Sequence, residues 1–465
     1  MPKHRSSDSD GAVARAMISE LWRAVGGEPG LIDKVQVTGT GSLPSVFAVS
    51  DFAVAAIATA GLALAEWTGA RSGITPDVQV DRRLASLWFG FSIAPQGWDL
   101  PPVWDAIAGD YATSDGWIRL HTNAPHHREA ALRVLGTAPE RQAVAARVAT
   151  LRADDLETAI VAAGGCAAAM RSRQQWADHP QGRAVLAEPL MRIDRGAGAP
   201  EFAADFDALR PLAGVRVLDL TRVLAGPVAT RFLAGFGADV LRIDPPSWDE
   251  GAVIPEVTPG KRCARLDLKN TSDRERFKAL LTDADVLVHG YRPDALEGLG
   301  LGADIREQLN PGLIDVSLDA YGWSGPWAGR RGFDSLVQMS CGIAQAGMAR
   351  GGADRPVPLP VQALDHGAGY LLAAAVVRGL TRRHTQAEGS CWRTSLAHVG
   401  GFLTCYPQGP ETGEIGKPER ADYADESEQT DWGPALRLRP PLRNGAAAMA
   451  WDRPAGKLGR SAAEW

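Results

Sequence analysis

The stretch GVRVLDLTRVLAGPVATRFLAGFGADVLRID, residues 214–244, constrains the fold more than any other part of the sequence. Its apolar pattern predicts a strand over 215–220, a helix over 225–238 that begins through a Gly-Pro turn, and a second strand over 239–244. Strand, tight turn, helix and strand within about thirty residues form a βαβ unit, whose two strands run parallel. The chain must therefore contain a parallel sheet with helices packed on its faces.

The same alternation continues further along the chain. Apolar runs predict strands at 264–268, 285–290 and 313–318, and a helix over 272–284 separates the first two of them. Strands that alternate with helices in this way are typical of a mostly parallel sheet. We therefore predict an α/β protein with a Rossmann-like domain, accompanied by a second, smaller α+β domain.

Composition and pattern divide the chain into six expected segments. Periodicity is weak in two of them. One mixes Gly, Pro, Ala and charged residues, and we expect it to be a linker; the other is rich in Pro, Gly, Glu and Arg, and we expect it to be an extended surface arm. The segments are an N-terminal extension (1–40), a helix-rich segment (41–110), a small α+β domain (111–187), the linker (188–212), the Rossmann-like domain (213–405) and the C-terminal arm (406–465).

The overall composition excludes some classes of function. The 465 residues carry a net charge of -6, and Lys and Arg (49) are outnumbered by Asp and Glu (55), which argues against binding to nucleic acid. The five cysteines are scattered without metal-site spacing, as expected in a reducing cytoplasm. Since the N-terminus is polar and no run of eighteen apolar residues occurs, we expect a cytoplasmic protein without a membrane span.

Three histidines, His121, His126 and His127, stand close together in the segment of the small domain. They lack the spacing of a third ligand or a carboxylate on a shared helical face. We therefore interpret them as part of a solvated loop in preference to a metal site, and predict no bound metal.

An internal repeat links the two halves of the chain. The run VFAVSDFAVAAIATAGLALAEWTG (46–69) resembles LPVQALDHGAGYLLAAAVVRGLTR (359–382): in each, an Asp opens an Ala-rich helix, and a short strand pattern follows. The matching acids are Asp51 and Asp365. An Asp at the start of a helix is usually an N-cap, so the motif alone does not make either residue a reagent.

Candidate ligand-binding residues follow the predicted strands. The Gly-Pro turn after 215–220 exposes backbone N–H groups, although no GxGxxG or Walker motif is present. Lys261 and Arg262 stand beside a strand, and Tyr291 and Arg292 follow another. Because ligands bind at the carboxyl ends of parallel strands, these side chains are candidates for binding phosphates and a base; ordinary surface charges are an equally good interpretation.

Several motifs in order carry a resemblance to a known family. They are GVRVLDLTRVLAGPVATRFLAGFGADVLRID, KRCARLDLKN, ADVLVHGYRPDALEGLGLG, LNPGLIDVSLDAYGWSGPWAGRRGFDSLVQMSCGIAQAG and ALDHGAGYLLAAAVV. Over roughly 213–400 the chain resembles the family III CoA-transferases, which include formyl-CoA and carnitine CoA-transferases and the α-methylacyl-CoA racemases. The resemblance implies transfer of CoA from an acyl-CoA to a carboxylic acid, with no permanently bound cofactor, in a homodimer.

The resemblance also implies roles for individual residues. Asp365 matches the catalytic carboxylate, which attacks the thioester to form a mixed anhydride, and Asp334 matches an acidic position that orients the substrate or tunes Asp365. The glycine-rich stretch 347–356 is a candidate oxyanion site, Gly367 and Gly369 are expected to leave room for the acyl chain, and His366 is expected to be a neighbour rather than a base. The implied CoA contacts are Val223, Leu224, Ala225, Arg242, Lys261, Arg262, Gly290, Tyr291, Arg292, Leu299 and Phe333.

Two alternatives to the transferase remain open. The racemases use a His in a Gly-His-Asp motif, but the tripeptide here is Gly332-Phe333-Asp334, which leaves proton abstraction without an obvious base. A non-catalytic CoA-binding subunit is the other alternative. Departures from formyl-CoA transferases at Leu224, Gly290-Tyr291 and Gly298 bear on acid specificity more than on CoA binding, and Arg292 is expected to replace a missing cation.

The order of parts also departs from the family. There the Rossmann-like half precedes the Asp helix and the small domain, whereas here 45–187, which resembles the Asp helix and small domain, comes first. A tandem fusion that lost one Rossmann-like half and one small domain accounts for this order. Asp51 then belongs to an incomplete copy, and we expect it to be a helix cap.

Overall fold

The computed structural model describes residues 7–199, 205–292, 294–409 and 413–465. Its largest sheet has seven strands in the order β10-β9-β8-β11-β12-β13-β7. The six strands from β10 to β13 are parallel, and β7 is antiparallel at the edge. The strands are β7 (Arg192–Gly198), β8 (Arg216–Leu220), β9 (Asp239–Asp244), β10 (Lys261–Arg265), β11 (Val286–His289), β12 (Ile314–Asp319) and β13 (Glu388–Ser395). This confirms the predicted α/β class.

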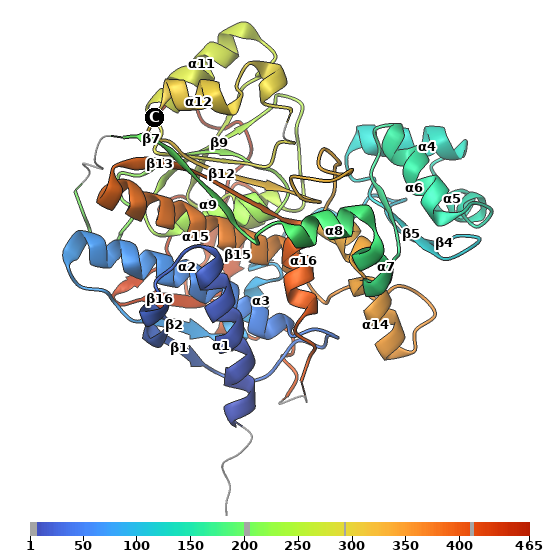
Figure 1. The fold of residues 1–465 in the computed structure, drawn as a ribbon, viewed down its shortest axis with the longest axis horizontal. Coiled ribbons are helices and arrows are strands. Elements are labelled where there is room, and N and C mark those ends of the chain that lie inside the picture. Colours follow the sequence, from blue (N-terminus) through green and yellow to red (C-terminus); the bar gives the residue numbers. More distant parts are fainter. Residues whose placement is uncertain (1–6, 200–204, 293, 410–412) are drawn as a thin grey trace, which may run out of the picture.

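Helices cover both faces of the large sheet (Figure 1). Helices α9 (Ala225–Gly235) and α15 (Ala363–Gln386) pack on one face, and α11 (Thr271–Thr282) and α12 (Ala303–Leu309) lie on the other. The alternation predicted over 214–318 is therefore present, but β10 begins at Lys261, before the predicted strand at 264–268. The strand order reverses between β8 and β11, and the carboxyl ends of these two strands form the switch point where open α/β sheets bind ligands.

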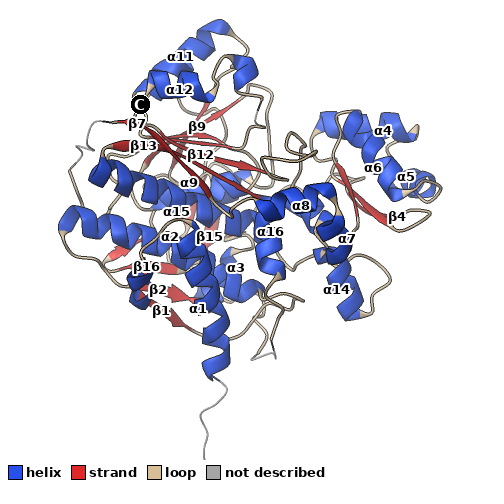
Figure 2. Cartoon of the chain, viewed as in Figure 1, coloured by secondary structure: helices blue, strands red, loops and turns tan. Residues whose placement is uncertain are grey.

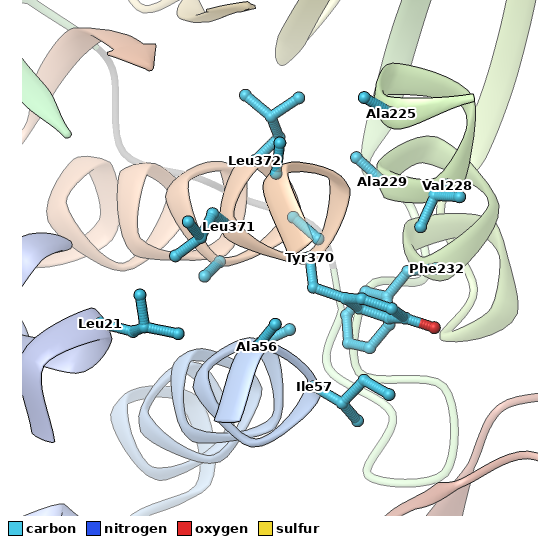
Figure 3. Close-up of a cluster of buried hydrophobic side chains, with 14 of the residues drawn as sticks. Leu21, Ala56, Ile57, Ala225, Val228, Ala229, Phe232, Tyr370, Leu371 and Leu372 are labelled. Atoms are coloured by element: carbon cyan, nitrogen blue, oxygen red, sulfur yellow. The ribbon is translucent and has the colours of Figure 1, made fainter. Parts of the chain in front are cut away.

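A second helix-and-sheet layer lies below α15 (Figure 2). Helix α2 (Val49–Ser72) packs along α15, and its far side faces a four-stranded sheet in the order β1-β2-β16-β17. Apolar side chains from α1, α2, α9 and α15 interlock between the two sheets (Figure 3). The elements of this layer are α1 (Ser7–Ala24), η1 (Pro29–Lys34), β1 (Val35–Thr38), β2 (Val78–Asp81), α3 (Arg82–Trp88), β16 (Leu442–Asn444) and β17 (Ala447–Ala448).

Helix α2 is long and apolar enough to cross a membrane, with a mean hydropathy of 1.5 in its most apolar window. However, 94% of that window is buried inside the protein. Its apolar character is explained by contacts with α1, α3 and α15, so it is a helix of the core.

The internal repeat of the sequence recurs in three dimensions. Helices α2 and α15 are both 24 residues long and begin 314 positions apart (363 − 49). The residues before them, Ala48 and Gln362, have φ and ψ of -73° and 63° against -77° and 64°. The same shift relates Asp81, which caps α3, to Ser395, which caps α16 (Leu396–Thr404). The two copies pack against each other within one chain.

The small domain stands to one side of the large sheet (Figure 1). Its three strands in the order β4-β5-β6 pack against helix α13 (Asp334–Ser340), which belongs to the Rossmann-like half. Its elements are β4 (Gly109–Ala112), β5 (Trp117–Leu120), α4 (Pro125–Leu135), α5 (Arg141–Val148), α6 (Ala153–Ala162) and β6 (Ala167–Ala169); α7 (Arg173–Asp178) and α8 (Pro180–Ala187) lead away from it.

The expected linker and C-terminal arm contain strands. The expected linker supplies β7, while residues 200–204 of it lie outside the described residues. The expected arm runs extended and supplies strands to sheets of the N-terminal half, where β15 pairs with β3 and β16 with β2. The remaining elements are β3 (Ile93–Pro95), α10 (Ile254–Val257), η2 (Glu297–Leu299), α14 (Ile343–Gly351), η3 (Arg420–Asp422), β14 (Glu428–Thr430) and β15 (Gly433–Arg437).

Candidate active site

Two carboxylates predicted as catalytic, Asp334 and Asp365, meet where α13 and α15 begin. Asp334 Oδ2 accepts the backbone N–H groups of Leu364 and Asp365 at 2.9 Å and 3.0 Å, and its Oδ1 accepts a hydrogen bond from Gln338 Nε2. Asp334 therefore caps the first turn of α15 from another helix, instead of capping its own. The positive end of α15 favours the ionised form of Asp334.

Burial makes both carboxyl groups harder to ionise than usual. Asp334 is 1% exposed and Asp365 is 6% exposed. Burial raises the pKa of Asp334 to about 6, although its three hydrogen bonds act in the opposite direction. Burial also raises the pKa of Asp365 well above its usual range, and the neighbouring Asp334 charge raises it further. Two buried carboxylates that oppose each other's ionisation are a common arrangement in active sites.

Asp365 is not a helix cap. The N-cap of α15 is Gln362, and Asp365 lies in the first turn beyond it. Among the described residues, no donor forms a hydrogen bond or ion pair with the side-chain carboxylate of Asp365. The backbone N–H of Asp365 donates to Asp334. Its oxygens therefore remain free to react with a bound molecule.

Asp51, at the matching position of α2, is held quite differently. Its Oδ1 and Oδ2 accept hydrogen bonds from Arg82 Nη1 and Nη2 at 2.9 Å and 3.1 Å, and both side chains are buried. The N-cap of α2 is Ala48, so the expected cap role of Asp51 is wrong. A bidentate ion pair neutralises this carboxylate and leaves it unsuited to attack a substrate.

The residues after Asp365 fill space in the core. His366 stacks on Phe89 with ring centres 5.3 Å apart, and burial lowers its pKa to about 3. A Cβ on Gly367 would lie 2.1 Å from Phe52 Cζ, and one on Gly369 would lie 2.6 Å from the backbone oxygen of Ala225. These glycines thus allow α15 to approach α2 and α9, and the room expected there for an acyl chain is already occupied.

The turn after β8 lies at the switch point of the sheet. Val223 has a φ of 64°, which is unusual for a β-branched residue, and its N–H is accepted by Glu250 Oε1. The next two predicted CoA contacts, Leu224 and Ala225, are buried where α9 begins. A strained turn at a helix N-terminus between two parallel strands is suited to approach by an anionic ligand.

Arg222 lies in this turn and was not predicted from the sequence. Its guanidinium carbon lies 4.8 Å from the ring centre of Trp248 and 5.3 Å from that of Tyr291, and its Nη2 donates to the Tyr291 hydroxyl at 2.9 Å. The position directly after a strand was the available signal. Gly290, Tyr291 and Arg292 follow β11 beside it, and Leu299 and Tyr291 both pack against the core cluster on that side.

The remaining predicted cations all form ion pairs with carboxylates. Arg242 is buried in ion pairs with Asp244 and Glu250. The Lys261 ammonium is enclosed by Asp219, Thr230 and the carbonyl of Pro227. Arg262, at the amino end of β10, pairs with Asp239. These side chains are engaged with carboxylates, and Arg242 lies next to the turn after β8, because its partner Glu250 also accepts the N–H of Val223.

Phe333 and the histidine cluster join the small domain to α13. Phe333 stacks on His121 with ring centres 3.7 Å apart. His121 and His127 are buried and only His126 is exposed, so the expected solvated loop is wrong for two of the three. Burial lowers the pKa of His121 to about 3 and that of His127 to about 4. Within the described part of the chain, no His, Cys, Asp and Glu residues form a metal-binding group.

The two candidate carboxylates, Asp334 and Asp365, lie in the part of the chain that is similar to known proteins. Residues 212–427 match the model of CoA-transferase family III. The chain is 37% identical over 194 residues to the acetyl-coenzyme A transferase nodX of Hypoxylon pulicicidum, covering 40% of this chain and 32% of that protein. It is 35% identical over 207 residues to the probable fatty acyl-CoA transferase Rv3272 of Mycobacterium tuberculosis, covering 41% and 51%.

A solved structure of Rv3272 from M. tuberculosis is similar as well. The match has 32% sequence identity and a TM-score of 0.39, and covers 42% of this chain and 56% of that chain. The chain thus spans about half, or less, of the length of these curated relatives.

Proposed function

Residues 212–427 match the model of CoA-transferase family III, and from this premise we propose that the protein moves CoA from an acyl-CoA thioester to a free carboxylic acid. The reaction passes through an acyl group carried on Asp365. One observation supports this proposal above the others: a buried carboxylate without a hydrogen-bonding or ionic partner among the described residues stands beside a second carboxylate that is fully engaged.

Each step has a balanced course. The Asp365 carboxylate attacks the thioester carbonyl, the carbon–sulfur bond breaks, the CoA thiolate leaves, and a mixed anhydride of Asp365 and the donor acid remains. The acceptor carboxylate attacks the Asp365 carbonyl and releases the donor acid, which leaves the acceptor acyl group on Asp365. The thiolate then attacks that acyl carbonyl, forms the new thioester and frees the Asp365 carboxylate.

Asp334 acts as a positioning residue in this proposal. Its hydrogen bonds to the N–H groups of Leu364 and Asp365 fix the first turn of α15, and its charge raises the pKa of Asp365. A carboxylate that is poorly solvated when ionised is a stronger nucleophile, because no solvent shell must be removed before attack. Burial of Asp365 serves this purpose.

We place CoA at the switch point, close to the turn after β8. Val223, Leu224 and Ala225 form that turn, and Tyr291 and Arg292 follow β11 next to it. Arg222 joins this group, because its guanidinium is already held between two aromatic rings. Phosphates of CoA suit the cations and the amino end of α9, and adenine suits stacking on Tyr291.

The assembly and the compartment remain part of the proposal. The homodimer and the cytoplasmic location follow from the resemblance and from the scattered cysteines, of which Cys166, Cys263 and Cys341 are buried thiols.

Exchange kinetics of Asp365 variants test the function. We expect Asp365→Ala and Asp365→Asn to lose at least about 1000-fold in kcat, as removal of a covalent nucleophile does. Binding of CoA, measured by calorimetry, stays within about twofold, since the switch point is unchanged. Asp51→Asn is the matched control, and its exchange rate should be that of the wild type.

Retention of full exchange by Asp365→Ala would exclude the covalent role. Exchange of the α-proton in heavy water without any acceptor acid would instead favour the racemase alternative. CoA binding without exchange or covalent adduct in the wild type would indicate a non-catalytic subunit.

A further inference from the structure

A pocket of about 570 Å³ lies between the small domain and the segment that leads into α15. Residues 355–358 form one wall, and β4, β5 and the chain before β4 form the other. Three arginines line the pocket, each from a different segment: Arg119, Arg141 and Arg355. The side chains of Trp104 and Trp117 complete the lining with apolar surface.

The arginines leave an excess of positive charge in the pocket. Arg119 Nη1 pairs with Asp110 Oδ1 at 2.8 Å, and its guanidinium carbon lies 4.7 Å from the ring centre of Trp104. The second lining carboxylate, Asp105, pairs with an arginine outside the pocket. Arg141 and Arg355 are exposed and form no ion pair among the described residues, although Arg141 Nη1 donates to the Ala108 carbonyl at 2.9 Å and its guanidinium carbon lies 5.2 Å from the ring centre of Tyr111. Two cations are therefore available to an anionic ligand.

The pocket adjoins the carboxylate pair of the candidate active site. The N–H of Leu359, next to the pocket wall, donates to Gln338 Oε1 at 2.8 Å, and Gln338 in turn holds Asp334. On the other wall, Arg119 lies close enough to oppose the effect of burial on the pKa of Asp334. The pocket wall is thus linked to Asp334 through Leu359 and Gln338, and Asp365 lies six positions beyond Leu359 in the chain.

We propose that this pocket binds the remote carboxylate of a dicarboxylic acceptor acid. Arg141 and Arg355 hold that carboxylate, and Trp104 and Trp117 flank the hydrocarbon chain that leads toward Asp365. A guanidinium offers paired N–H donors that match a carboxylate, so two of them select strongly for it. The inference rests on the proposed transfer and adds the class of acid that accepts CoA.

Two acids of equal length separate this proposal from a general acid site. Adipate and hexanoate both have six carbons, but only adipate carries a second carboxylate. With one acyl-CoA as donor, we expect wild-type kcat/KM to be higher for adipate. In the double variant Arg141→Ala/Arg355→Ala, kcat/KM for adipate should fall roughly tenfold or more, because charged hydrogen bonds to its second carboxylate are lost. The value of kcat/KM for hexanoate should not change. Arg355→Lys, with Arg141 retained, should keep part of the preference.

Arg152→Ala is the matched control. Arg152 is an exposed arginine of the same small domain that does not line the pocket, so its loss should change kcat/KM for neither acid. Thermal melts of all variants confirm that the fold persists, and both arginines replaced in the double variant are exposed.

Direct binding separates failure of this inference from failure of the proposed transfer. Titration of adipate into the Asp365→Ala variant should show binding that the two arginine substitutions abolish. Arginine-dependent binding of adipate without any CoA transfer by the wild type would contradict the proposed transfer function but support the proposed role of the pocket. Equal wild-type rates with both acids, or equal losses with both acids in the double variant, would overturn the pocket assignment.

Discussion

At the scale of single residues, the site depends on the contrast between two aspartates at the same place in two copies of a helix. Asp51 is neutralised by Arg82, whereas Asp365 faces another carboxylate. The sequence predicted both residues and the nearby Asp334, but not their environments. The hydrogen bonds of Asp334 to the start of α15 span about thirty positions, and Arg82 lies equally far from Asp51, so local pattern carries no signal for either contact.

Removal of the Asp334 charge should move the pH dependence of transfer. Attack requires ionised Asp365, so the rate falls as pH decreases through the titration of the pair. Burial and the Asp334 charge raise the pKa of Asp365, and Asp334→Asn removes the second cause while its amide oxygen can still accept the N–H groups of α15. The acidic limb of kcat/KM should therefore shift to lower pH.

The measurement is a profile of kcat/KM between about pH 4 and pH 9, which brackets the pKa of about 6 for Asp334. Asp283→Asn, which removes an exposed carboxylate at the end of α11, is the control and should leave the limb in place. A limb that stays fixed, or moves to higher pH, in Asp334→Asn contradicts the coupling of the two carboxylates.

At the scale of elements, what could be predicted depended on how local the signal was. The βαβ alternation from β8 to β12 follows from periodicity within short windows, and the sheet is present as expected. Strands β7, β15 and β16 were missed because each pairs with a strand from a distant part of the chain, which a local sequence pattern does not show. The ion pairs of Lys261 with Asp219 and of Arg262 with Asp239 could not be predicted either, because position beside a strand does not tell which end or face a side chain occupies.

The close packing of the two copies makes a specific prediction at Gly367. An added Cβ would lie 2.1 Å from Phe52 Cζ, between α15 and α2. Gly367→Ala should therefore lower the free energy of unfolding by about 1–3 kcal/mol, the usual cost of overpacking a core. Urea unfolding followed by circular dichroism measures the change.

Gly298 offers the matched control. No heavy atom lies within 4 Å of a Cβ built on it, beyond its chain neighbours, so Gly298→Ala should leave the free energy of unfolding nearly unchanged. A neutral or stabilising effect of Gly367→Ala would show that α2 and α15 do not pack as closely as described.

At the scale of the whole molecule, one chain contains two copies of a helix-and-strand unit but one candidate site. The copies exchange edge strands: β7, which follows the first copy, pairs with β13 of the second, and β16, which follows the second, pairs with β2 of the first. Only the second copy is joined to a full parallel sheet with a switch point, and only there is the helix aspartate without an arginine partner among the described residues. We therefore expect one acyl group per chain.

Mass spectrometry of the protein after incubation with acyl-CoA tests this account most directly. The chain is incubated with donor in the absence of acceptor, treated with hydroxylamine to trap an activated carboxyl group, and digested. We expect one modified site per chain, on the peptide that contains Asp365, and no change in the peptide that contains Asp51. Modification of Asp51, or exchange activity without any modification of Asp365, would contradict it.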